Sequence, residues 1–162
     1  MGDGLILPQV ELRLETRCRR QIENNLDRRR PDDGARAEVE GYKRRYPAPR
    51  TQHRPVGPSY SYNCHGLTFA ARRTRIWKSG EIQKILTDDG YEEIKDFAQV
   101  MIGDIAIYMQ GNEAIHSGLV VEKADFQTRV LSKWGSAHEV LHWQSDCDEY
   151  RGSIVKFYRM RV

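Results

Sequence analysis

Cys64 and His116 are the two residues whose types and surroundings favour nucleophilic chemistry. Cys64 lies in the polar segment 62–66 (YNCHG), just before an apolar run that is typical of a helix. The thiolate is the nucleophilic form of cysteine, and unpaired amides at a helix N-terminus favour it. His116 opens an apolar segment that is typical of a strand. Because nucleophile and base commonly come from distant parts of a chain, we expect Cys64 to attack and His116 to take its proton.

Three segments stand in a fixed order: YNCHG at 62–66 before an expected helix, GDIAIY at 103–108 opening a strand, and HSGLV at 116–120 opening the next. This order resembles the NlpC-like and CHAP-type branch of the papain-like cysteine peptidase or amidase superfamily. The resemblance covers about residues 58–134. It implies hydrolysis or acyl transfer at an amide or peptide bond, through a thioester on the cysteine and without a cofactor.

The residue that orients His116 is left open. In the resembled family it is a polar residue on the strand after the histidine strand, and Ser132 holds that position. The family more usually has His, Asn, Gln or an acid there, so Ser132 departs from the pattern. His142, on the following expected strand, is the second candidate and ranks above His138.

Several residues near the expected nucleophile are candidates for contact with substrate. Gly66 would allow a substrate to approach the backbone, and the Cys64 amide would donate to a developing oxyanion. Trp134 would line a substrate groove, although aromatic side chains on strands more often belong to the core. The substrate or oxyanion candidates are Tyr62, Asn63, His65, Gly66 and Trp134.

The three cysteines, Cys18, Cys64 and Cys147, favour free thiols in a reducing compartment. They cannot all pair within one chain, and no closely spaced pair suggests zinc. Zinc held by Cys64 and the adjacent His65 is disfavoured, because neighbouring ligands strain tetrahedral geometry. We therefore expect no metal and no cofactor, and no catalytic role for Cys18 or Cys147.

Apolar residues concentrate after about residue 58, which predicts a catalytic domain over 58–162. A helix opening near Cys64 and a second around 81–86 precede a series of expected strands, an α+β order. The strands are expected at about 105–109, 115–122, 128–134, 139–143 and 154–159. This order predicts N-terminal helices packed on an antiparallel sheet of about five strands, and the resemblance implies that this α+β fold is papain-like.

Residues 1–57 are predicted to be a basic helical arm and a Pro-rich linker. Apolar residues four apart in 9–30 predict a helix that ends at Pro31, and the four prolines of 43–58 favour extended chain. Lys plus Arg outnumber Asp plus Glu by 13 to 9 in this part of a chain with net charge +3. That excess is small beside a polybasic tail, so nucleic-acid binding is not expected.

Two other functions stay open. The first is a binding module whose catalytic geometry has lapsed and which recognises a peptide or protein partner, motivated by the unusual Ser132. The second places the function in residues 1–57, as a basic arm for nucleic acid or as a contact for a protein partner. The sequence shows no secretory signal and no apolar run of about 20 residues, so we expect a cytoplasmic protein with no membrane contact.

Overall fold

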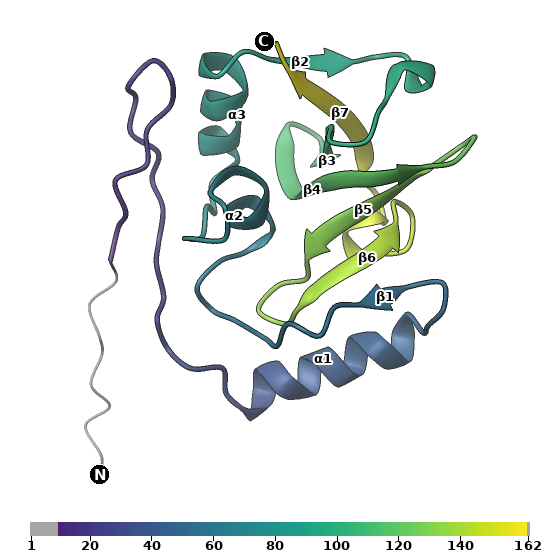
Figure 1. Cartoon of the computed structure of the whole chain (residues 1–162). Coiled ribbons are helices and arrows are strands. Elements are labelled where there is room, and N and C mark those ends of the chain that lie inside the picture. Colours follow the sequence, from purple (N-terminus) through teal and green to yellow (C-terminus); the bar gives the residue numbers. More distant parts are fainter. Residues whose placement is uncertain (1–9, 162) are drawn as a thin grey trace.

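The computed structural model describes residues 10–161 as an α+β fold, in which three α-helices pack on a seven-stranded antiparallel open sheet (Figure 1). The strand order across the sheet is β1-β6-β5-β4-β3-β7-β2. The helices are α1 (Asp33–Arg45), α2 (Cys64–Phe69) and α3 (Ser79–Asp88). The strands are β1 (Gln52–His53), β2 (Tyr91–Ile94), β3 (Ile105–Gln110), β4 (Glu113–Lys123), β5 (Thr128–Lys133), β6 (Glu139–Trp143) and β7 (Ile154–Met160).

The predicted α+β class and antiparallel sheet are confirmed, and the strand number of about five is corrected to seven. The five expected strands are β3 to β7. The two that the prediction missed, β1 and β2, form the two edges of the sheet. β1 has only two residues and β2 carries Glu92 and Glu93, and short or charged strands are usual at sheet edges because they discourage pairing with other chains.

The helix predicted over residues 9–30 is wrong. The described part of this segment, residues 10–30, is extended and folds back on itself through the isolated bridges Val10–Leu26 and Glu15–Gln21. A spacing of four is even, so it fits the alternation of extended chain as well as a helix stripe. Asn24 holds the extended form: its side chain accepts from the Leu12 amide (2.9 Å) and donates to the Leu12 carbonyl (2.7 Å).

Helix α1 begins where the sequence analysis placed a stop. The Asp32 side chain caps the helix by accepting from the Ala35 amide (2.9 Å). Asp33 in the first turn and three basic residues in the last turn match the helix dipole. The Pro-Asp-Asp sequence therefore starts a helix, and α1 spans one end of the sheet below β1 and β6 (Figure 1).

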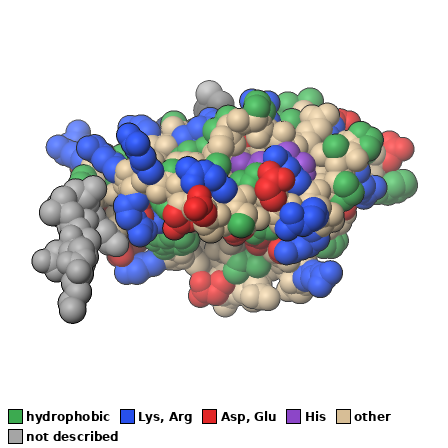
Figure 2. All heavy atoms as spheres, turned by 90° about the horizontal axis from the view of Figure 1, so that it is seen from below, with side chains coloured by type: hydrophobic (Ala, Val, Ile, Leu, Met, Phe, Trp, Pro, Cys, Tyr) green, Lys and Arg blue, Asp and Glu red, His purple; other side chains and the backbone are tan. Residues whose placement is uncertain are grey.

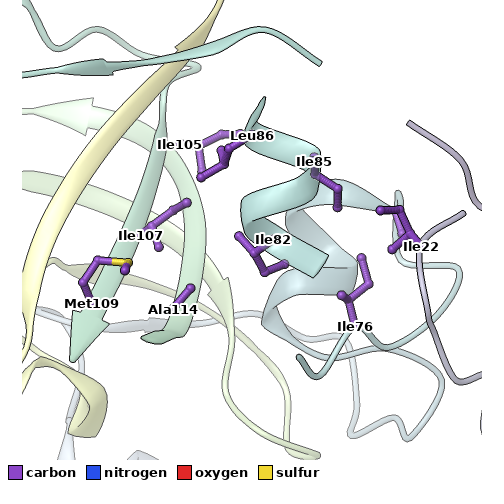
Figure 3. Close-up of a cluster of buried hydrophobic side chains, with 10 residues drawn as sticks. Ile22, Ile76, Ile82, Ile85, Leu86, Ile105, Ile107, Met109 and Ala114 are labelled. Carbon is purple, nitrogen blue, oxygen red and sulfur yellow. The ribbon is translucent and has the colours of Figure 1, made fainter. Parts of the chain in front are cut away.

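Apolar side chains form a core on each face of the sheet. On the α2 and α3 face, Leu86 of α3 lies beside Ile105 of β3, and Ile85 of α3 lies toward Ile22 of the N-terminal segment, all within one buried cluster (Figure 3). Residues 10–57 thus pack against the rest of the chain. The opposite face holds a second core, formed by these residues: Val100, Ala106, Tyr108, Val120, Val130, Trp134, Val140, Cys147 and Phe157.

None of the helices described over residues 10–161 is long and apolar enough to cross a membrane.

Candidate active site

Cys64 is the first residue of α2, as the sequence predicted, and its side chain is buried. Asn63 caps the helix: its Oδ1 accepts from the Gly66 amide (2.9 Å) and the Ile76 amide (3.1 Å). Its Nδ2 donates to the Ile76 carbonyl (2.7 Å). Both ends of the Asn63 amide are therefore used to fix the start of α2, which positions the thiol.

The thiol of Cys64 lies against strand β4, one residue from His116. The backbone amide of Ser117 favours its thiolate, as do the amides of His65 and of Cys64 itself. Strand N–H groups lie in the plane of a sheet, and the pairing of β4 with β5 ends at Gly118–Ser132. The Ser117 amide lies next to the point where the pairing of β4 with β5 ends.

The ring of His116 is fully buried on the sheet face opposite α2. His116 is the cross-strand partner of Tyr108, with ring centroids 5.1 Å apart, and its ring lies 6.4 Å from that of His142. Its Nε2 has no hydrogen-bond partner among the described residues, so it is not bonded to the Cys64 sulfur. A buried nitrogen without a partner is costly. Because the ring lies on the face opposite α2, transfer of the Cys64 proton to His116 stays a prediction.

Ser132 and His142, the two candidates for the orienting role, bind each other. Nδ1 of His142 lies 2.8 Å from the Trp143 carbonyl oxygen, which can only accept, so this nitrogen carries the proton. Nε2 then accepts from the Ser132 hydroxyl, 2.7 Å away. The pair is fully buried beside His116, and neither member donates to the His116 Nε2. Which group orients His116 stays a prediction.

Burial keeps the nucleophile and the base neutral in this structure. Desolvation raises the pKa of the Cys64 thiol to about 12, against the favourable effect of the three amides. Desolvation, together with the charge of His65, lowers the pKa of His116 to about 3. At neutral pH the site therefore holds a thiol and a neutral imidazole, and any proton transfer from sulfur must accompany attack on a substrate.

His65 attaches α2 to β4. Its Nδ1 lies 2.8 Å from the Ser117 hydroxyl and its Nε2 lies 3.2 Å from the Ala114 carbonyl oxygen. The Ser117 hydroxyl in turn donates to Thr68 of α2 (3.0 Å). Both ring nitrogens are thus engaged by protein, and desolvation lowers the pKa of His65 to about 4.

Two more of the predicted substrate residues make internal contacts. The Tyr62 hydroxyl donates to Glu139 (2.7 Å), and burial together with this hydrogen bond raises the Tyr62 pKa. A Cβ at Gly66 would lie 1.8 Å from the Thr74 carbonyl oxygen, so Gly66 provides close approach for the chain itself. Substrate contact by Tyr62, Asn63, His65 or Gly66 stays a prediction.

Trp134 and His138 lie beneath α1. The Trp134 ring makes edge contacts with Tyr42 and Tyr46 at centroid distances of 5.0 Å, so its surroundings are those of a core residue. His138 Nε2 lies 2.7 Å from Nδ1 of His53, whose own Nε2 lies 2.7 Å from the Tyr46 carbonyl oxygen. These contacts join α1, β1 and the β5–β6 turn.

Lys133, Ser117 and Glu139 surround the start of α2 and were not predicted as site residues. All three are buried polar side chains on the α2 face of the sheet. No sequence pattern marked them, because a lysine or glutamate within a strand normally indicates an exposed position. Their burial becomes visible only when the strands are assembled.

No protein-family model, curated protein or solved structure matches this chain. Within residues 10–161, no group of three or more His, Cys, Asp and Glu residues is placed to hold a metal ion. The geometry around Cys64 is therefore the basis for a proposed function.

Proposed function

We propose that the protein is a papain-like, cysteine-dependent hydrolase or acyl transferase, and that it acts on an amide or peptide bond. Cys64 attacks the carbonyl carbon, the sulfur–carbon bond forms and the thiol proton passes to His116. The imidazolium then protonates the leaving group, and water or an amine releases the acyl group from the thioester. The chemistry needs no cofactor.

The observation that carries this proposal is the position of the Cys64 thiol. It lies at the start of α2, and the amide of Ser117, the residue after His116 on β4, favours its thiolate. The amides that favour a thiolate are also suited to an oxyanion, because both are small anions that accept hydrogen bonds. A cysteine that served only packing would not need such a polar setting.

The burial of Cys64 favours a second candidate function. A thiol with a pKa of about 12 and no bond to His116 Nε2 is what a lapsed enzyme would retain. In that case the same fold would bind a peptide or a protein partner without chemistry. The two candidates differ in one outcome, the formation of a covalent acyl group on sulfur.

Nucleic-acid binding by the arm gains no support from the charge distribution. Basic side chains of residues 10–57 pair with acidic ones, as in Arg50–Asp146 (2.5 Å) and Lys43–Glu40 (2.9 Å). Figure 2 shows the face on the α1 side, where basic and acidic side chains are intermixed. Such a surface does not form the continuous positive electrostatic potential that favours binding of a phosphate backbone.

The proposal predicts that Cys64→Ala and His116→Ala abolish hydrolysis of a small activated ester, such as nitrophenyl acetate. We expect the rate above background to fall by at least about 100-fold in each variant, because nucleophile and base act in the same step. Cys18→Ala is the matched control, since this thiol is exposed and far from α2 in sequence, and it should retain the parent rate. Parent-like turnover by Cys64→Ala would rule the proposal out.

A further inference from the structure

Lys133 is a fully buried lysine on the α2 face of the sheet. Its ammonium donates to the Ser59 carbonyl (3.0 Å) and the Gly135 carbonyl (2.8 Å), and lies 5.1 Å from the centre of the Tyr62 ring. These are neutral groups. A buried ammonium without an adjacent carboxylate is costly to retain.

The carboxylate nearest along the sheet is already taken. Glu139 is the cross-strand partner of Lys133, but its oxygens accept from Arg72 (2.5 and 3.1 Å) and from Tyr62 (2.7 Å). Lys133 consequently keeps a charge that is not cancelled by a direct ion pair. Desolvation lowers its pKa to about 8, while the charges of Cys64, Glu38 and Glu139 act in the opposite direction.

The contacts of the Lys133 ammonium lie close to the start of α2. Ser59 and Tyr62, which contact the ammonium, belong to the segment that leads into α2. The register Gly118–Ser132 makes Ser117 and Lys133 the next positions on the two strands, where β4 and β5 separate. Ser117 is the residue whose amide faces the thiol. Lys133 therefore lies beside Ser117 on the sheet, and its ammonium contacts the Ser59 carbonyl and the Tyr62 ring just before Cys64.

We propose that Lys133 is a positioning residue of the site: its buried ammonium stabilises the negative charge that develops at Cys64 and on the attacked carbonyl oxygen. This inference rests on the proposed function. As the sulfur–carbon bond forms, the carbonyl electrons move to oxygen and the thiol proton moves to His116, while Lys133 keeps its own proton. In the low-dielectric interior a fixed cation at this position is worth more than in water.

The test is the rate at which iodoacetamide alkylates Cys64, followed by peptide mass spectrometry at a fixed pH near 7, where Lys133 with a pKa of about 8 carries its proton. The reagent is uncharged, so Lys133 cannot attract it, and the exposed Cys18 reports on reagent and conditions in the same sample. Lys133→Met removes the charge. Lys133→Gln removes the charge but keeps a donor for the carbonyls, and Lys133→Arg keeps both.

We expect Cys64 labelling to slow by about tenfold in Lys133→Met and Lys133→Gln, the effect of one pKa unit on the thiolate fraction, and to return in Lys133→Arg to within about threefold of the parent. A purely structural lysine predicts the opposite sign, since loosened packing would expose the thiol and speed its labelling. If Lys133→Met does not fold, Lys133→Gln and Lys133→Arg give the same comparison.

Labelling of Cys64 in both neutral variants that is as fast as in the parent, or faster, would overturn the inference. This outcome is separate from failure of the proposed function, because alkylation needs no substrate. Slowed labelling together with ester hydrolysis that persists in Cys64→Ala would retain the Lys133–Cys64 coupling and reject the hydrolase.

Discussion

Gly66→Ala is expected to destabilise the protein by more than about 3 kcal/mol, enough to prevent folding of many domains. A Cβ at this position would lie 1.8 Å from the carbonyl oxygen of Thr74 and 3.2 Å from the Tyr62 Cβ. The obstructing oxygen belongs to the backbone, so it cannot be moved by a change of side-chain rotamer. Relief requires α2 to shift away from the Thr74 segment, which would also displace Cys64.

Gly41→Ala is the matched control for this prediction. Gly41 lies within α1, and a Cβ there meets no atom within 4 Å. Alanine in an open helix position should stabilise the protein by roughly 0.5–1 kcal/mol, because glycine loses more backbone freedom on folding. Urea unfolding of the two variants measures both effects. Equal stabilities would mean that α2 does not approach Thr74 as described.

Acidification from pH 7 to about 5 is expected to remove about 8 kcal/mol of stability, the second large effect. His65, His116, His138 and His142 are buried and neutral, with pKa values lowered by desolvation to about 4, 3, 4 and 4. In the unfolded chain each titrates near 6.5, so the unfolded state binds more protons between these values. Stability contributed by the neutral rings is complete above about 6.5 and declines as the pH falls, by about 2 kcal/mol for each histidine at pH 5.

This pH window isolates the histidines from the carboxylates that also stabilise the fold. Hydrogen bonds from Arg29 and Arg20 hold the pKa values of Asp27 and Asp88 at about 2, so these groups lose their contribution only below about pH 4. Burial raises the Glu149 pKa, which offsets part of the loss.

Chemical unfolding at a series of pH values measures how the free energy of unfolding changes with pH. His116→Gln should reduce the pH dependence by about one quarter, since it removes one of the four buried histidines with a lowered pKa. Unfolding free energies that stay constant between pH 7 and 5 would show that these rings are accessible to protons in the folded protein.

The sheet was predictable from sequence because β3 to β7 alternate or run apolar between clear turns. The N-terminal segment was not. Its apolar residues recur every four positions. Residues four apart share one face of a helix, but they also share one face of an extended chain. The deciding contacts are non-local: Asn24 binds Leu12 and also accepts from the Thr74 hydroxyl (2.8 Å). No local pattern in 9–30 contains that information.

The site was predictable to the extent that it depends on local sequence. Polar flanks and a following apolar run placed Cys64 at a helix start, and Asn63 as its cap explains why that start is sharp. The partners from β4 and β5 could not be oriented, because a strand residue can face either side of a sheet until the register is known. Only that register shows that Ser117, Lys133 and Glu139 lie on the α2 face of the sheet.

The measurement that tests the central claim most directly is the location of the acyl group after brief reaction with nitrophenyl acetate. The protein is quenched in acid, digested, and its peptides are analysed by mass spectrometry. We predict an acetyl group on the Cys64 sulfur that is released on longer incubation and is absent from His116→Ala. Ester consumption with acetyl groups confined to Cys18 or to surface lysines would contradict the assignment of Cys64 as the nucleophile.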